Sequence, residues 1–313
     1  MALNLANTVV EFLQQNPEQK FTAREVANWI FETYPDECQQ KLERSSKVKN
    51  DDDLVKQITG EIYAVTFKDR LQKHGIKMME DRPRRFYFTH ATDDEEIAKA
   101  ESHKPSPDTK AKGSVVKEHD LYPILSEFLW SELELYSKRI DEKRSRNSRG
   151  AGGNKWLYPD LVGMEDLSSD WHREIKDCVQ QYANKKTKLW SFEVKILINR
   201  SNVREVFFQA VSNSSWANFG YLVASEIEGA DTLKELRMLS SLHGIGFIRL
   251  DAENPSESQI MIPAKERIEI DWDTANRLTE ENKDFLQYIK LIRQFYQTGE
   301  IRQSDWDMNT EQD

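Results

Sequence analysis

An apolar run at residues 189–198, LWSFEVKILI, carries a carboxylate and an ammonium near its centre, Glu193 and Lys195. Alternate side chains of a β-strand point to opposite faces. One face of this strand would therefore be apolar and directed into a core, with Phe192, Val194, Ile196 and Ile198. Charged groups inside an apolar strand cost free energy unless they are paired, hydrated or bound to a metal. The run therefore predicts a buried strand whose other face carries a functional site.

Helical and strand patterns alternate on both sides of this run. We expect helices at residues 118–140, 169–183, 203–211, 232–242 and 273–298. We expect strands at residues 155–164, 188–198, 217–225 and 245–250, and edge strands at 258–262 and 268–272. Such alternation favours an α/β layer fold, here an α+β mixed sheet.

The first 91 residues show helices followed by a hairpin. Thr22 with Glu25 three residues later forms a capping box, and a long helix should begin in the run of three aspartates at residues 51–53. Residues 76–89 predict a β-hairpin with an arginine-rich turn. This order resembles a winged helix-turn-helix domain, in which the long helix enters the major groove of DNA and the wing touches phosphates. A small helical interaction domain is the alternative.

The net charge of −10 conceals two basic segments. Residues 68–85 hold seven lysines and arginines against three acids, and residues 138–155 hold seven against two. Residues 92–116 have no aromatic residue and mix charge with proline and serine, which predicts a flexible linker. The expected organisation is a domain at 1–91, the linker at 92–116, a second domain at 117–300 and an acidic tail at 301–313.

Two cysteines, Cys38 and Cys178, do not form a disulfide framework, and no cysteine and histidine ladder has zinc spacing. The start of the sequence lacks the pattern of a signal peptide. No apolar stretch approaches the roughly 20 residues that span a bilayer. We therefore expect a cytoplasmic protein without a membrane segment.

Asp160 is the second acid that context singles out. Pro-Asp and acid-x-Lys patterns recur in this chain, but only Asp160 and the Glu193/Lys195 pair lie in apolar, strand-like runs. The two carboxylates, with the carbonyl of Val194 between them, offer the oxygen ligands that Mg²⁺ or Mn²⁺ prefers. Such a cation polarises a phosphate and helps to ionise a water, and Lys195 could orient that water or stabilise charge in the transition state. An exposed Glu/Lys pair on an edge strand, with Asp160 in a turn, is the alternative without chemistry.

This order of helix, Pro-Asp strand, Glu-Val-Lys strand, helix and strand resembles the core of the PD-(D/E)xK, restriction-endonuclease-like superfamily over about residues 118–225. The resemblance implies a metal-dependent DNA endonuclease, used in bacterial defence or restriction. It also implies an acid on the first helix, Glu118 or Glu127, of which Glu118 at the helix entrance is favoured. Gln209 on the following helix matches a residue that completes the site in some branches. The stretch FFQAVSNSSWANFGYLVAS is similar to the HrgA-like bacterial proteins, which are found beside restriction–modification genes.

The expected partner is DNA, bound through the two basic segments. The residues expected to contact it are Lys68, Arg70, Lys73, Arg82, Arg84, Arg85, Arg144, Arg146, Arg149 and Lys155. A homodimer would suit cleavage of both strands. The glycine-rich end of the second basic segment, RGAGGNK at residues 149–155, lacks the Gly-Lys-Ser/Thr ending of a Walker A motif, so no nucleotide site is evident. A non-catalytic DNA-binding regulator on a degenerate nuclease fold and a protein-interaction module remain as other readings.

Overall fold

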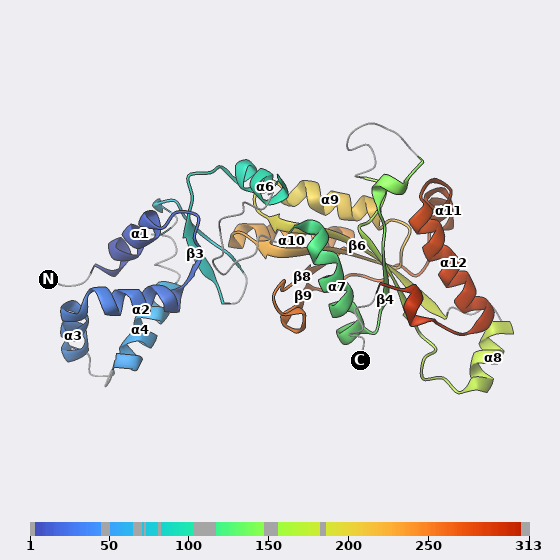
Figure 1. Ribbon diagram of the computed structural model, residues 1–313, viewed down its shortest axis with the longest axis horizontal. Coiled ribbons are helices and arrows are strands. Elements are labelled where there is room, and N and C mark those ends of the chain that lie inside the picture. The colour runs from blue at the N-terminus through green and yellow to red at the C-terminus, as the bar shows by residue number, and fades with distance from the viewer. Residues whose placement is uncertain are drawn as a thin grey trace. The chain divides into compact units, whose positions relative to one another are not determined.

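The computed structural model describes residues 4–44, 51–64, 71, 73–80, 83–102, 117–146, 156–181 and 186–307. The chain divides into two compact units. Unit 1 comprises Met1–Glu96 with Ile227–Ala230, and unit 2 comprises Ile97–Glu226 with Asp231–Asp313. Figure 1 labels many of the elements of the two units.

Unit 1 combines helices with a small antiparallel sheet. Its elements are α1 (Leu5–Gln15), β1 (Phe21–Thr22), α2 (Ala23–Thr33), α3 (Pro35–Arg44), α4 (Asp51–Tyr63), β2 (Ile76–Met78) and β3 (Arg85–Phe88). The sheet order is β1-β3-β2, and both pairings are antiparallel. The expected capping box is present, because Thr22 Oγ1 accepts from the backbone N–H of Glu25 at 3.2 Å and Glu25 Oε2 accepts from that of Thr22 at 2.7 Å.

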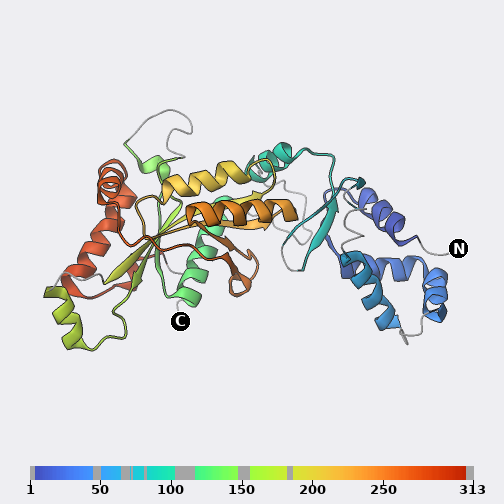
Figure 2. The same ribbon diagram turned by 180° about the vertical axis from the view of Figure 1, so that it is seen from behind.

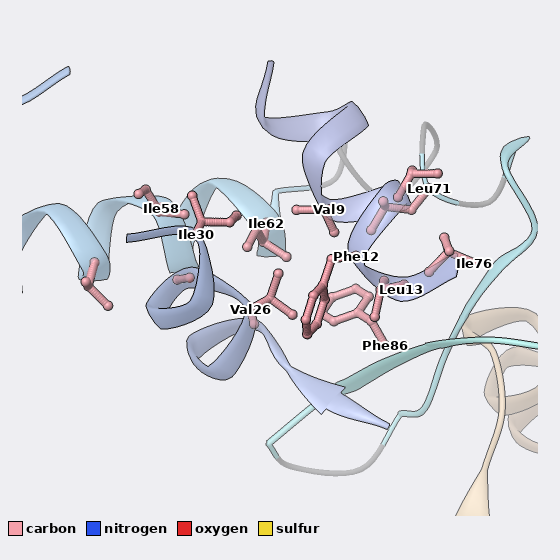
Figure 3. Packing of buried hydrophobic residues seen from close by; sticks show 14 of the residues in the cluster. Val9, Phe12, Leu13, Val26, Ile30, Ile58, Ile62, Leu71, Ile76 and Phe86 are labelled. Carbon is pink, nitrogen blue, oxygen red and sulfur yellow. The ribbon is translucent and has the colours of Figure 1, made fainter. Parts of the chain in front are cut away.

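The core of unit 1 is formed by side chains from its helices and the β2–β3 hairpin, together with Leu71 (Figure 3). The labelled members are Val9, Phe12, Leu13, Val26, Ile30, Ile58, Ile62, Leu71, Ile76 and Phe86. The predicted hairpin is present, and of the helix predicted from residue 51 to residue 71 the part Asp51–Tyr63 is helical, while residues 65–70 lie outside the described residues. The short helix α3 was not expected, because its sequence PDECQQKLER offers little apolar periodicity beyond the buried Cys38 and the half-buried Leu42.

The expected flexible linker needs a correction at its start, where α6 (Asp93–Ser102) is helical. Composition alone overlooked a local capping box, in which Thr92 and Glu95 exchange side-chain hydrogen bonds with each other's backbone N–H at 2.7 and 3.3 Å. The acidic side chains of the first turn stabilise the helix, because they lie at the positive end of its dipole. Asp93 and Glu96 also both pair with Lys77. Residues 103–116 lie outside the described residues.

Unit 2 is an α/β domain around a mixed six-stranded sheet with the order β4-β5-β6-β7-β8-β9. Strand β4 pairs antiparallel with β5, β5 antiparallel with β6, β7 parallel with β8, and β8 antiparallel with β9. The strands are β4 (Tyr136–Arg139), β5 (Leu161–Asp166), β6 (Thr187–Ile198), β7 (Phe219–Ile227), β8 (Gly246–Arg249) and β9 (Gln259–Ile262). The helices are α7 (Glu118–Leu133), α8 (Arg173–Gln181), α9 (Val203–Asn213), α10 (Ala230–His243), α11 (Trp272–Glu281) and α12 (Lys283–Thr298).

Helices cover both faces of this sheet. Figure 1 shows α7 over one face, and the reverse view in Figure 2 shows α10 over the other. Alternate residues of a strand reach the two sides: Leu161 of β5 joins the core under α7, whereas Val162 packs with residues of α12. The expected α/β class and mixed sheet are therefore confirmed.

The expected helix at residues 118–140 ends early, at Leu133. Glu134 adopts a left-handed conformation with φ 53°, and the N–H of Leu135 donates to the carbonyl of Leu129 at 3.0 Å. This is a common helix C-terminal motif, after which the chain reverses into β4. The predicted helix was too long because the buried residues Leu135 and Ile140 continue the apolar pattern of the helix beyond its end.

Two further expectations near the C-terminus were wrong. The predicted helix at 273–298 is interrupted at Asn282, whose side chain accepts hydrogen bonds from the N–H groups of Asp284 and Phe285 and so begins α12. The expected edge strand at 268–272 is not a strand, because Asp271 caps α11.

The first seven residues of the expected acidic tail are part of unit 2. Trp306 is 6% exposed and belongs to the core cluster that contains α12 residues. The carboxylate of Asp307 accepts from the backbone N–H of Arg139 in β4 at 2.7 Å. The excess of acidic residues therefore suggested a tail, whereas residues 301–307 pack against the domain. In the described part of the chain, no helix is long and apolar enough to cross a membrane.

Candidate active site

A cavity of about 570 Å³ in unit 2 gathers five of the residues singled out from the sequence. They are Glu118, Asp160, Glu193, Lys195 and Gln209. Glu118 is the first residue of α7, Asp160 directly precedes β5, Glu193 and Lys195 lie in β6, and Gln209 lies in α9. Segments more than 90 residues apart in sequence therefore meet at this cavity.

Strand β6 separates its side chains between two faces, as expected. Phe192 and Val194 belong to the core cluster that contains α7 residues. On the other face, Lys195 Nζ donates to Glu193 Oε1 at 2.6 Å. Asn213, at the end of α9, donates from Nδ2 to Glu193 Oε2 at 2.8 Å. Glu193 is only 2% exposed, and both oxygens of its carboxylate are hydrogen-bonded within the protein.

Asp160 lies at the entrance to β5 rather than inside the strand expected at 155–164. Its backbone continues the ladder, since its N–H donates to the carbonyl of Phe192 at 3.0 Å and its carbonyl accepts from Ile140 at 2.9 Å. Its side-chain Oδ2 accepts from the backbone N–H of Val194 at 2.7 Å. This bond fixes the Asp160 carboxylate beside the Glu193–Lys195 segment.

The first-helix acid at the cavity is Glu118. Its Oε2 is 3.9 Å from Lys195 Nζ, and its Oε1 accepts from the hydroxyl of Tyr122 at 2.9 Å. The same hydroxyl is 3.1 Å from Asp160 Oδ1. Glu127 lies on an exposed side of α7 and does not line the cavity.

Burial and crowding of negative charge shift the pKa values of the site. Burial, with Asp160 nearby, raises the pKa of Glu193 to about 8, against the opposing effect of Lys195 and Asn213. Burial also raises the pKa of Glu118, which Lys195 partly offsets. For Lys195, burial alone would lower the pKa, but Glu193, Asp160 and Glu118 together raise it above its usual value. One ammonium therefore faces three carboxylates.

Burial likewise raises the pKa of the Tyr122 phenol, and the charges of Asp160 and Glu118 add to this effect. The phenol therefore keeps its proton at neutral pH. Arg139 of β4 covers this side chain, with its guanidinium 4.9 Å from the centre of the Tyr122 ring.

The oxygen donors and the excess negative charge at Glu118, Asp160 and Glu193 suit a hard divalent cation. In the part of the chain that the structure describes, however, no three His, Cys, Asp or Glu side chains are grouped to hold a metal ion. The carboxylates instead accept hydrogen bonds from Lys195, Tyr122 and the other donors given above. The residues therefore fit a divalent cation by their oxygen donor atoms and their net negative charge, while the structure itself has these carboxylates in a hydrogen-bonded network.

Basic side chains form part of the cavity wall. The exposed residues Lys117, His119, Arg139 and Lys143 line it beside the acids. Arg139 and Lys143 belong to the basic segment at 138–155 but were not singled out from sequence. Tyr122 and Asn213 were also missed. Tyr122 lies four residues after Glu118, a spacing that places both on one side of a helix, so this signal was present.

The residues expected to bind DNA have varied surroundings. Lys73 and Arg146 are exposed, and Arg85 lies half-buried in β3. Arg84 is 3.5 Å from Glu80, and Arg144 pairs with Asp284. The remaining five lie outside the described residues, namely Lys68, Arg70, Arg82, Arg149 and Lys155.

Comparison with known proteins gave no match: no family model, curated protein or solved structure matches this chain. The resemblance to PD-(D/E)xK nucleases and to HrgA-like proteins therefore rests on the residues and the order of elements alone.

Proposed function

We propose that this protein is a divalent-metal-dependent DNA endonuclease with a PD-(D/E)xK site. The observation that carries the proposal is the convergence of Glu118, Asp160, Glu193, Lys195 and Gln209 on one cavity. Glu193 and Lys195 are adjacent on one strand face by their spacing, but Glu118, Asp160 and Gln209 come from other segments, and the sequence patterns alone did not fix their distance from this strand.

The order of elements supports the same proposal. Helix α7, the strands β5 and β6, helix α9 and strand β7 occur in the order that the resemblance implies, with α8 between β5 and β6. Strand β4, which the sequence patterns did not predict, lies between α7 and β5 and pairs with β5 at the edge of the sheet.

Each site residue has a role in the proposed reaction. Asp160, Glu193 and the carbonyl of Val194 would hold Mg²⁺ or Mn²⁺, with Glu118 beside them. The bound cation would supply Lewis acidity to the phosphate and lower the pKa of a water. Lys195 stays protonated because three carboxylates surround it, so it can stabilise negative charge that develops on the phosphate. Gln209 would orient a polar group of the substrate or water.

Further features favour DNA as the substrate. The basic wall of the cavity provides cations for the phosphates that flank the scissile bond. Unit 1 combines the helices α1, α2, α3 and α4 with a β2–β3 hairpin whose strand β3 also pairs with β1, and helices followed by such a hairpin support a winged helix-turn-helix domain. We infer that unit 1 holds DNA, that the protein acts against foreign DNA in a bacterial cytoplasm, and that a homodimer cuts both strands.

One observation favours a second function, that of a non-catalytic DNA-binding regulator. Both oxygens of Glu193 are hydrogen-bonded to Lys195 and Asn213. A degenerate site would retain this closed arrangement and bind no cation.

A cleavage assay separates the two functions. Supercoiled and linear DNA would be incubated with the purified full-length protein in Mg²⁺, in Mn²⁺ and in EDTA. The endonuclease predicts nicked and linear products with either cation and none in EDTA. DNA binding without cleavage in either cation would instead support the regulator, and cleavage in EDTA would refute the metal-dependent site.

A further inference from the structure

Tyr122 stands between two acids that come from different parts of the fold. Its hydroxyl is 2.9 Å from Glu118 Oε1 and 3.1 Å from Asp160 Oδ1, although Asp160 lies 38 residues further along the chain. One side chain therefore joins the start of α7 to the entrance of β5.

The position of this hydroxyl is set by packing. Tyr122 is 8% exposed, and its ring belongs to a core cluster with Leu121, Leu125 and residues of β6. Arg139 lies over the ring at 4.9 Å. A tyrosine has only two side-chain torsions, so a packed ring leaves its hydroxyl little freedom.

A hydroxyl in this place differs from Lys195 in one important respect. Lys195 also lies close to Glu118 and Glu193, but its positive charge competes with a cation for the same carboxylates. Tyr122 orients Glu118 and Asp160 without neutralising either. It therefore preserves the negative charge that attracts a divalent cation.

The contact with Tyr122 is one of the two contacts that orient the Asp160 carboxylate. Its Oδ2 accepts from the backbone N–H of Val194, and its Oδ1 faces the Tyr122 hydroxyl. Without the hydroxyl, the carboxylate keeps one hydrogen bond and can rotate about it. Residues that orient metal ligands in this way typically contribute about 10- to 100-fold to metal affinity or activity.

We propose that Tyr122 is a positioning residue that holds Glu118 and Asp160 together as one cation-binding pair. This inference rests on the proposed function, because it takes the two acids as part of the cation site. It assigns Tyr122 no contact with the substrate.

The test is Mn²⁺ binding to the full-length protein, measured by the electron paramagnetic resonance signal of free Mn²⁺. Tyr122→Phe removes one oxygen and leaves the ring packed. Tyr288→Phe is the matched control, because Tyr288 is fully buried and its hydroxyl donates to the carbonyl of Gly163 in β5 at 2.7 Å. Thermal unfolding of both variants measures the structural effect of losing a buried hydroxyl.

We expect Tyr122→Phe to raise the dissociation constant for Mn²⁺ by about 10-fold, and Tyr288→Phe to leave it unchanged. The double variant Glu118→Gln with Tyr122→Phe should bind more tightly than the product of the two single losses predicts, since the hydroxyl acts in part through that acid. Unchanged Mn²⁺ binding in Tyr122→Phe overturns the proposal, and so does an equal loss in Tyr288→Phe. Absence of Mn²⁺ binding by the unmodified protein overturns it as well.

The same measurement separates this inference from the endonuclease. If the unmodified protein binds Mn²⁺ and Tyr122→Phe weakens that binding, Tyr122 has the proposed role even where no DNA is cut. If the protein cuts DNA but Tyr122→Phe binds Mn²⁺ normally, the endonuclease stands and the role of Tyr122 is refuted.

Discussion

Lys195 Nζ lies 2.6 Å from Glu193 Oε1 in the same strand, and 7% of Lys195 and 2% of Glu193 are exposed. Removal of one member of an isolated buried pair costs about 3–5 kcal/mol, but Lys195 also has Glu118 at 3.9 Å. We therefore expect Glu193→Ala to lower the free energy of unfolding by less than about 3 kcal/mol. Glu193→Gln keeps an acceptor for Lys195 and should cost less.

Urea unfolding of the metal-free variants measures this difference. The double variant Glu193→Ala with Lys195→Met should regain part of the lost stability, because the buried ammonium that lost its nearest partner is removed as well. A double variant less stable than Glu193→Ala alone would show that the pair is not the source of the loss.

The raised pKa of Glu193 predicts a dependence of stability on pH. A carboxyl group whose pKa rises from 4.5 to about 8 on folding binds its proton more tightly in the folded state. Its contribution to stability is fully present below pH 4.5 and is lost as the pH rises through about 8. The metal-free protein should lose this contribution between those values.

Glu193→Gln provides the comparison for that measurement, since it cannot titrate. The difference in unfolding free energy between the unmodified protein and Glu193→Gln should change with pH across this window. A difference that stays constant from pH 5 to 8 would contradict the buried, charge-crowded environment assigned to Glu193.

The side chains of β6 show how much of the site could be predicted from sequence. Because alternate residues of a strand point to opposite faces, the sequence places Phe192 and Val194 on one face and Glu193 and Lys195 on the other. The structure has the same arrangement. Helix and strand alternation likewise predicted the α/β class, because each element needs an apolar face.

Other features depend on contacts that sequence spacing does not encode. Glu118 and Glu127 are nine residues apart, which is about two and a half helical turns, so they face opposite sides of α7. Only the packing of α7 on the sheet decides that Glu118 lines the cavity. Asn213 reaches Glu193 because α9 packs against β6. Strand β4 was missed because its flanking apolar residues continued the helical pattern.

Arg139 should contribute to DNA binding at the cavity. Its guanidinium packs on Tyr122 at the cavity wall. Arg139→Gln should weaken DNA binding and reduce the slope of log K against log salt by about 1. Lys138→Gln is the matched control, because Lys138 pairs with Asp307 at 3.3 Å and does not line the cavity.

Fluorescence anisotropy with a labelled duplex at several salt concentrations checks this expectation. Equal effects of Arg139→Gln and Lys138→Gln would mean that general charge, and not the cavity wall, governs binding.

Trp306 should be needed for the stability of unit 2. It is 6% exposed and packs with Tyr288 and Tyr136. Trp306→Ala should cost about 3–5 kcal/mol, whereas Trp272→Ala should cost little, since Trp272 is 57% exposed. Chemical unfolding of both variants makes the comparison, and equal costs would contradict the packing of residues 301–307.

The central claim is that Asp160, Glu193 and Lys195 form a metal-dependent nuclease site. Its most direct test is the rate of plasmid cleavage in Mn²⁺ by Asp160→Asn, Glu193→Gln and Lys195→Met. Lys188→Ala is the control on the same strand, since Lys188 pairs with Glu266 and does not line the cavity. We expect the three site variants to lose at least about 100-fold in rate, on the order of 2.7 kcal/mol in transition-state stabilisation, and Lys188→Ala to retain the rate of the unmodified protein. Full activity in any of the three folded site variants would contradict the claim.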